Sequence, residues 1–351
     1  METMNTDKLM NPFDEQPYSE YETLFDPFET DRKARRKHAP RVHYQPKVAR
    51  TDVLGQITDE VGWETDFAIS YKPSKYEAAW LYDSLRGFFE QTLITDVLSL
   101  VQGGKEATVY CCSAHPSLGV ETLALKVYRP QMFRALTNDQ IYRQGREILS
   151  IEGHVVHENQ DRIMRAIGKK TTFGRQVSHA SWLMHEYQAM QTLFQAGAQV
   201  PKPYQAAPNA ILMEFIGSGM TAAPMLQSIR LEHEQAQTLC KVVLENIEIM
   251  LQNGWIHGDL SAYNILFADG SIRIIDLPQV VNPRDNNHAP AILARDVQRV
   301  CDYFANQGVA CDAQAIYKDL WDRYLHVPAH IRKADQSRMA QYYPDIFSDS
   351  D

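Results

Sequence analysis

The chain has 351 residues, 44% of them apolar, and carries a formal net charge of −9 at pH 7. This length and apolar content allow one two-lobed domain or two ordinary domains with a hydrophobic core. The acidic balance excludes binding of nucleic acid through bulk charge. Five cysteines without C-x-x-C spacing argue against a zinc site or a disulfide framework.

The sequence holds no run of about eighteen apolar residues, the length that spans a bilayer. Its first residues, METMNTDKLMNPFDEQ, are acidic and polar, whereas a secretory signal peptide is basic and then apolar. We therefore expect a cytoplasmic protein that does not associate with a membrane.

Residues 1–60 mix proline, charge and scattered aromatic residues without a sustained hydrophobic period. Such a segment buries too little surface to offset its ordering entropy, so we expect a disordered or loosely attached tail. Within it, Arg32 to Arg50 contains eight Lys or Arg residues and no acid, while residues 1–31 contain nine acids and the single cation Lys8. This basic tract is either a solvated linker or a contact with an RNA-containing particle.

A helix and three strands are predicted next. From Ser74 to Glu90, apolar residues recur at helical spacing. The runs LITDVLSLV, TVYCC and TLALKVY then have the composition of strands, and turn residues separate them at Gly103-Gly104 and at His115-Pro116. We expect an antiparallel meander that follows the helix.

Residues 129–180 are charged and irregular, and we interpret them as an insertion with a mobile portion. Four glycines interrupt any long element there: Gly145, Gly153, Gly168 and Gly174. The next helix is predicted for Ser181 to Ala196, with Gly197 and Pro201 as its stop. One apolar face of this helix would consist of Leu183, Tyr187, Met190 and Phe194.

The remaining elements are a buried strand, AILMEF (Ala210 to Phe215), a helix from Glu234 to Gln252, two short strands (NILF and SIRII) and a helix around Ala291 to Phe304. A β-rich half is thus followed by a helical half. This order predicts an α+β fold with an N-lobe of residues 61–216 and a C-lobe of residues 217–351.

The most informative stretch is WIHGDLSAYNILFADGSIRIID, from Trp255 to Asp276. It has the form H-x-D-L-x-x-x-N, followed by an aspartate at the end of an apolar strand, which is the arrangement of catalytic and metal loops in protein kinases. Phosphoryl transfer needs a carboxylate near the nucleophile, which suits Asp259, and hard oxygen ligands for Mg²⁺, which suit Asn264 and Asp276. An ordinary turn rich in Asp and Asn is the competing interpretation, which Asp276 makes less plausible.

Lys126 lies in the centre of the apolar strand TLALKVY. A buried ammonium is unfavourable without an anionic partner, so this lysine either reaches solvent or pairs with a carboxylate. Glu186 on the predicted helix is the natural partner, although Glu147 is nearer in sequence and competes with it.

The turn VQGGKEATVY, just upstream of Lys126, is a candidate phosphate-binding loop. It is neither a Walker A loop nor a regular G-x-G-x-x-G loop, and alone it would be an ordinary hairpin turn. Its candidate residues are Gly104, Lys105, Glu106, Ala107 and Val109.

The strand AILMEFIG leads into a candidate hinge between the two lobes. Adenine would meet main-chain groups of Glu214, Phe215 and Ile216, with Met213 lining the pocket behind. A plain core strand is compatible with the same residues.

Four motifs occur in this order: GKEATVY, LALKVYR, HGDLSAYNIL and IIDLPQ. Together they resemble the RIO kinases, a family of atypical serine/threonine protein kinases, and the resemblance runs from about Leu93 to Phe304. The resemblance implies a protein-kinase-like two-lobed fold with a small helical C-lobe that lacks peptide-docking segments. It implies ATP and Mg²⁺, with Mn²⁺ as an alternative ion. It also implies that Asp259 is the catalytic base, that Asn264 and Asp276 bind metal and that Lys126 pairs with Glu186.

The same resemblance implies a flexible loop within Gln131 to Arg175 and an ATPase route through an aspartyl-phosphate on Asp276. No winged-helix pattern precedes Leu93, which favours the family branch without that domain. The chain departs from the D-F-G motif of ordinary kinases because Leu277-Pro278 follows Asp276, and proline stiffens this loop.

The acceptor is the open question. A protein hydroxyl, including one of this chain, is the expected acceptor. H-G-D-L with the following asparagine also resembles aminoglycoside and lipopolysaccharide-core kinases, which phosphorylate small molecules or sugars, although GKEATVY argues against that group. The third alternative is a nucleotide-gated ribosome-assembly factor that attaches to its particle through Arg32 to Arg50, because eukaryotic and archaeal family members serve maturation of the small ribosomal subunit.

Overall fold

A computed structural model of the chain describes residues 67–104, 106–129, 140–150, 153–156, 161–169 and 171–325. All of them belong to one compact unit, Gln56–Asp351. The predicted tail with its basic tract lies outside the described residues, as do Lys105, much of the predicted flexible loop and the end of the predicted C-lobe.

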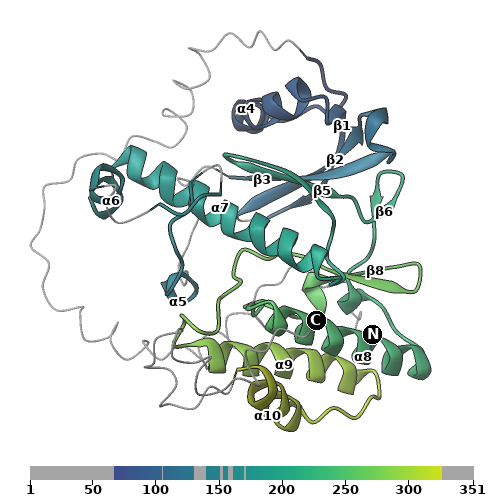
Figure 1. Cartoon of the computed structure of the whole chain (residues 1–351). Coiled ribbons are helices and arrows are strands. Elements are labelled where there is room, and N and C mark those ends of the chain that lie inside the picture. The colour runs from purple at the N-terminus through teal and green to yellow at the C-terminus, as the bar shows by residue number, and fades with distance from the viewer. Residues whose placement is uncertain are drawn as a thin grey trace, which may run out of the picture. The chain divides into compact units, whose positions relative to one another are not determined.

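The N-lobe is built on a five-stranded sheet in which every pair of neighbours is antiparallel (Figure 1). Its strand order is β1-β2-β3-β5-β4. The first three strands form the predicted meander. The strands are β1 (Ile94–Gly103), β2 (Ala107–Ala114), β3 (Thr122–Tyr128), β4 (Pro203–Ala207) and β5 (Ala210–Glu214).

The side chains of β3 alternate between two faces of the sheet, as the two-residue period of a strand requires. Leu123, Leu125 and Val127 join a cluster with α4 (Lys75–Glu90). Ala124 and Tyr128 join the core that contains α7 (Thr172–Gln195). Lys126 shares this second face, so the strand register directs its ammonium towards α7.

The predicted helix at the start of the N-lobe is confirmed as α4. Ser74 caps its N-terminus in a capping box with Glu77, which satisfies two otherwise unpaired N–H groups. Leu81, Leu85 and Phe88 are fully buried against the sheet. In Figure 1, α4 and α7 cover opposite faces of the sheet.

The segment predicted as an insertion contains α5 (Gln140–Arg143), α6 (Asp161–Gly168) and the first turns of α7. The predicted start of α7 at Ser181 and the role given to Gly174 were therefore wrong. Gly174 does not break a helix. It lies in the first turn of α7, where a Cβ would come within 2.0 Å of the carbonyl oxygen of Ala166, so glycine permits the close packing of α6 on α7.

The inward face of α7 also differs from the prediction at one position. Leu183, Tyr187 and Met190 are buried, but Phe194 is 39% exposed and Leu193 is buried in its place. Both positions follow Met190 by one turn, so helical spacing alone does not choose between them.

The C-lobe consists mainly of helices: α8 (His233–Gln252), α9 (Ala289–Asn306) and α10 (Ala313–Tyr324). Leu239, Val243, Ile247 and Met250 of α8 are buried, as predicted. The described part of the lobe also contains two hairpins: β6 (Gly217–Ser218) with β7 (Thr221–Ala222), and β8 (Ile265–Ala268) with β9 (Ser271–Ile274).

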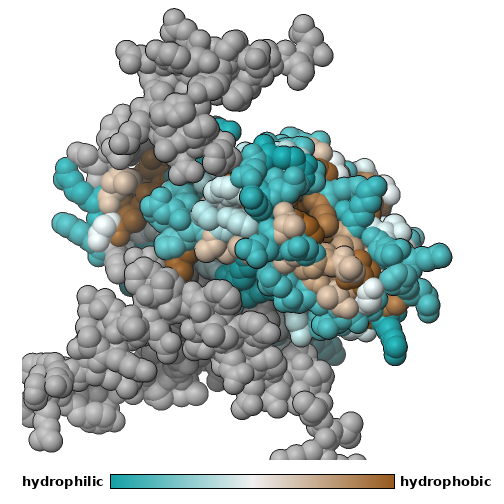
Figure 2. All heavy atoms as spheres, turned by 90° about the horizontal axis from the view of Figure 1, so that it is seen from below, coloured by the Kyte–Doolittle hydropathy of each residue, from teal (hydrophilic) through white to brown (hydrophobic). Residues whose placement is uncertain are grey.

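The α+β, protein-kinase-like two-lobed fold is thus confirmed. From Leu277 to Leu325, where the description ends, the helices are α9 and α10. Seen from below in Figure 2, most of the described surface is hydrophilic, with an apolar area among the polar side chains. Among the described residues, no helix combines the length and apolar character needed to cross a bilayer.

Candidate active site

The ammonium of Lys126 joins two carboxylates that lie far apart in the sequence. Its Nζ is 2.6 Å from Oε1 of Glu186 on α7 and 2.6 Å from Oδ1 of Asp276, which follows β9. Glu186 is 1% exposed, whereas the side chain of Asp276 is 44% exposed. The second oxygen of Glu186 accepts a hydrogen bond from the hydroxyl of Tyr128. Lys126 thus pairs with Glu186 as predicted. The competing candidate, Glu147, is exposed, and its backbone carbonyl lies against His185.

These contacts shift the pKa values of the charged groups. Burial acts to lower the pKa of Lys126, but the carboxylates of Asp276 and Glu186 outweigh it and raise that pKa well above its ordinary value. Loss of water acts to raise the pKa of Asp276, but the ammonium of Lys126 outweighs it and lowers that pKa. Both groups therefore stay charged around neutral pH, which suits a site for a phosphate and a cation.

Asp276 adopts a left-handed backbone conformation, with φ of 68°. Aspartate tolerates this region better than most residues do, but the surroundings must hold it there. Arg146, in the segment after α5, donates from Nη2 to the carbonyl oxygens of Pro278 at 2.8 Å and Val280 at 2.7 Å. The insertion thus holds the loop that follows Asp276.

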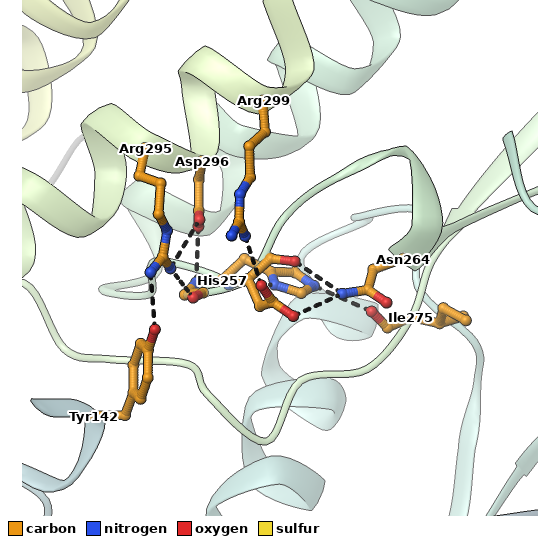
Figure 3. Close-up of polar contacts among 9 residues, drawn as sticks. Tyr142, His257, Asn264, Ile275, Arg295, Asp296 and Arg299 are labelled. Atoms are coloured by element: carbon orange, nitrogen blue, oxygen red, sulfur yellow. Dashed lines mark hydrogen bonds and ion pairs between the residues drawn. The ribbon is translucent and has the colours of Figure 1, made fainter. Parts of the chain in front are cut away.

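Asp259, the predicted base, is held at both carboxylate oxygens by two side chains that Figure 3 labels, Arg299 and Asn264. Oδ1 accepts from Nη1 of Arg299 at 2.6 Å, and Oδ2 accepts from Nδ2 of Asn264 at 3.3 Å. The same amide nitrogen of Asn264 donates to the backbone oxygen of Asp259 at 2.8 Å. The side chains of Asp259 and Arg299 are 22% and 24% exposed, so this ion pair is partly accessible to solvent.

The hairpin β8–β9 brings Asp276 back beside this loop. Ile265 pairs with Ile274, and the N–H of Ile275 donates to the carbonyl of Asn264 at 2.9 Å. His257, which is 2% exposed, adds a second link. Its Nε2 lies 3.1 Å from the carbonyl oxygen of Ile275, and its Nδ1 accepts from the N–H of Asp259.

Helix α9 fixes the other side of the predicted catalytic loop, His257 to Asn264 (Figure 3). The buried carboxylate of Asp296 accepts from the N–H of Gly258 at 2.8 Å, and Arg295 donates to the carbonyl of Gly258. Arg295 also donates to the hydroxyl of Tyr142, on α5, at 2.9 Å. The catalytic loop, α9 and the insertion are therefore one hydrogen-bonded network.

Gly258 is required at its position for two reasons. Its φ is 85°, a region that favours glycine, and a Cβ there would lie 2.2 Å from the carbonyl oxygen of Gln279. This contact brings the catalytic loop directly against the segment that follows Asp276.

The residues predicted to bind Mg²⁺ fit that ion. The amide nitrogen of Asn264 points to Asp259, which leaves its side-chain oxygen as a ligand, and Asp276 offers an exposed, ionised carboxylate. Two hard oxygen donors are typical of a Mg²⁺ site that substrate phosphates and waters complete. Among the described residues, no cluster of three or more His, Cys, Asp or Glu side chains forms a full protein cage for a metal.

The candidate phosphate loop is the tight turn between β1 and β2. The N–H of Gly104 donates to the carbonyl of Ala107 at 2.9 Å, and the carbonyl of Glu106 accepts from the N–H of Arg129. Val109 pairs directly with Lys126 in the sheet, so its side chain lies on the same face as the ammonium. The loop is thus placed next to Lys126, whereas Lys105 lies outside the described residues.

The candidate hinge follows β5. Met213 is buried on the sheet opposite Ala124, and the N–H of Glu214 donates to the carbonyl of Lys202. Phe215 packs on the core, and the carbonyl of Ile216 accepts from the N–H of Ala223. Within the described part of the chain, the N–H of Ile216 makes no hydrogen bond, so it remains available to an adenine acceptor.

Several site residues were not predicted from the sequence. Tyr128 was missed because a tyrosine in an apolar strand resembles core. A signal in the sequence could have indicated the charged residues of α9. Charged side chains next to the buried face of a helix are unfavourable without partners, which predicts ion pairs or hydrogen bonds there. The charged residues are Arg295, Asp296 and Arg299, and the buried apolar ones are Leu293, Val297 and Val300. Arg146 carried no such signal because it lies in an irregular segment.

The fold and the lysine with its two carboxylates define a protein-kinase-like domain. A family model described as RIO1, the RIO domain, matches residues 141–316, which is half of the chain. The chain therefore belongs to the RIO domain family.

Rio1 of Haloferax volcanii, a RIO-type serine/threonine-protein kinase, is 30% identical over 224 residues, which are 62% of this chain and 66% of that protein. The human serine/threonine-protein kinase RIO1 is 27% identical over 62% of this chain and 35% of its own length. The chain thus spans less than two thirds of either relative. The crystal structure of the Rio2 kinase-ADP/Mg²⁺-phosphoaspartate complex from Chaetomium thermophilum aligns with a TM-score of 0.49 and 20% identity, over 78% of this chain and 76% of that one.

Proposed function

We propose that the protein is an ATP-dependent phosphotransferase of the RIO type. It transfers the γ-phosphoryl group of Mg-ATP to a protein hydroxyl, to itself, or to water through an aspartyl-phosphate on Asp276. The observation that carries this proposal is the pair of 2.6 Å contacts that joins Lys126 to Glu186 and to Asp276. A buried ammonium anchored by one carboxylate and facing a second, exposed one is the arrangement that phosphate and a divalent cation need.

Lys126 binds phosphate oxygens in this account, while Glu186 holds it in place. Because Glu186 is buried and also bonded to Tyr128, it stays with Lys126 when the nucleotide enters. Asp276 is the exposed partner, and its carboxylate would be free to hold a cation as well as the ammonium. The bound Mg²⁺ would neutralise phosphate charge, and Asn264 and Asp276 would hold it.

Asp259 receives the proton of the acceptor hydroxyl. Its carboxylate is partly exposed on the loop that also carries Asn264, so an acceptor can approach it from solvent. A general base must lie within hydrogen-bond reach of the proton that it removes, and both oxygens of Asp259 keep further lone pairs for this contact.

Membership of the RIO family supports a protein acceptor over a small molecule, since the relatives named above are serine/threonine-protein kinases. An assembly role, with attachment of Arg32 to Arg50 to a ribosomal or other RNA-containing particle, remains a further proposal because that tract lies outside the described residues. Attachment of this kind would weaken steeply as salt is raised.

The test is to incubate purified protein with Mg²⁺ and γ-labelled ATP and to follow the label. Free phosphate, label on a hydroxyl and base-labile label on a carboxylate are separated. The proposal predicts that one or more of these products forms, and that Asp259→Asn and Asp276→Asn each reduce it strongly. Absence of every labelled product in the wild type, or transfer to a small hydroxylated compound alone, would overturn it.

A further inference from the structure

The carboxylate of Asp259 accepts hydrogen bonds from two side chains, Asn264 and Arg299. Only Asn264 belongs to the predicted catalytic loop. Asn264 is five residues away and holds Oδ2, whereas Arg299 lies on α9 and holds Oδ1 at 2.6 Å. The contact to Arg299 is the shorter of the two and joins opposite charges. Charge-assisted bonds of this length are the stronger kind.

Helix α9 is a rigid support for this guanidinium. Asp296 is 1% exposed and accepts from the N–H of Gly258, and Arg295 donates to the carbonyl of the same residue. Tyr303, one turn beyond Arg299, donates from its hydroxyl to the carbonyl of Leu226 at 2.8 Å. The helix is thus tied to the C-lobe on both sides of Arg299.

We propose that Arg299 is a positioning residue for phosphoryl transfer and acts through Asp259. With Oδ1 held by Arg299 and Oδ2 by Asn264, the carboxylate has one orientation, and its remaining lone pairs face the acceptor. This inference rests on the proposed function. Without Arg299 the carboxylate would keep only the longer contact to Asn264 and would rotate.

The expected effect falls on the rate of transfer and leaves nucleotide binding unchanged. A misplacement of about 1 Å at a reacting group lowers the rate on the order of a hundredfold. The nucleotide is held by Lys126 and the hinge, which Arg299 does not contact among the interactions described. Arg299→Ala should therefore lower kcat by about tenfold to a hundredfold, with the KM for ATP within about twofold of wild type.

The matched control is Arg323→Ala. Arg323 lies on α10 and, like Arg299, makes a short ion pair on a helix of the C-lobe, to Asp319 and Glu248. The two variants should have similar thermal midpoints, and Arg323→Ala should keep the wild-type kcat. Arg299→Lys, or free guanidinium added to Arg299→Ala, should restore part of the lost rate, since either supplies a cationic donor to Oδ1.

Three results would overturn the inference: a kcat of Arg299→Ala equal to that of Arg323→Ala, a loss confined to the KM for ATP, or a rise in kcat, which would make Arg299 an inhibitory latch. Failure of both guanidinium and Arg299→Lys to restore any rate would also count against it. A wild-type protein that turns over no ATP would instead overturn the proposed function, and the inference with it.

Discussion

Lys126 and Asp276 are separated by 150 residues in the sequence, yet Nζ of one lies 2.6 Å from Oδ1 of the other. The contact links the central strand of the N-lobe sheet to the loop after β9. Because the ammonium also pairs with Glu186, it connects α7 in the N-lobe to the loop after β9 in the C-lobe. Removal of this lysine should therefore affect both stability and nucleotide binding.

Lys126→Met should destabilise the protein by about 3–5 kcal/mol, because it leaves the buried carboxylate of Glu186 without its cation. Urea unfolding at neutral pH measures the change. The control is Lys241→Met, which removes an exposed ion pair to Glu245 on α8 and should cost less than about 0.5 kcal/mol. A loss in Lys126→Met no larger than in this control would contradict the burial of the pair.

The pKa shifts predict how stability depends on pH. The lowered pKa of Asp276 means that its contribution is present above about pH 4, the unfolded value, and is lost as the pH falls through the folded pKa. The raised pKa of Lys126 means that its contribution is present below about pH 10 and is lost as the pH rises through the folded pKa. The stability difference between wild type and Lys126→Met should thus be flat near neutrality and shrink in acid. A difference that grows in acid would be inconsistent with the pairing.

Gly258→Ala should impair catalysis more than its backbone conformation alone explains. The comparison is Gly270→Ala, because Gly270 has φ of 77° but nothing within 4 Å of an added Cβ. Both variants carry a penalty of about 1–2 kcal/mol for a left-handed alanine. Only Gly258→Ala also pushes the catalytic loop away from Gln279. We expect a lower kcat in Gly258→Ala alone, and equal kcat values in the two variants would contradict this role.

Arg146→Met should weaken the response to Mg²⁺. It removes the donor to the carbonyls of Pro278 and Val280 and so loosens the loop next to Asp276. A hydrogen bond from a charged group contributes about 1.5–3 kcal/mol. The concentration of Mg²⁺ at half-maximal ATP turnover should rise, while Arg284→Met, at an exposed arginine of the following segment, should leave it unchanged. An unchanged Mg²⁺ response in Arg146→Met would show that the loop is held by other contacts.

Much of the site was predictable because its parts are local in sequence. Asp259, Asn264 and Asp276 share one loop and one hairpin, and the alternation of TLALKVY places Lys126 on a definite face of its strand. These features follow from short-range geometry, so the motif and the strand pattern were sufficient to predict them.

The contacts that fix this loop depend on tertiary packing and were not predictable in the same way. Arg299 reaches Asp259 only because α9 packs against the predicted catalytic loop, and Arg146 reaches Pro278 only because the insertion docks on the C-lobe. The early start of α7 was missed for a related reason. From sequence alone, Gly174 is interpreted as a helix breaker. Its role in the close packing against Ala166 follows only from the tertiary structure.

In the proposed function, Lys126, Glu186 and Asp276 form one site for a magnesium-bound nucleotide. Calorimetric titration of the protein with ADP, in the presence of Mg²⁺ and then of a chelator, tests it most directly. Chelation should weaken ADP binding by the wild type, Asp276→Asn should show little dependence on Mg²⁺, and Lys126→Met should bind ADP more weakly under both conditions. Nucleotide binding by the wild type that chelation leaves unchanged, or full Mg²⁺ dependence in Asp276→Asn, would contradict it.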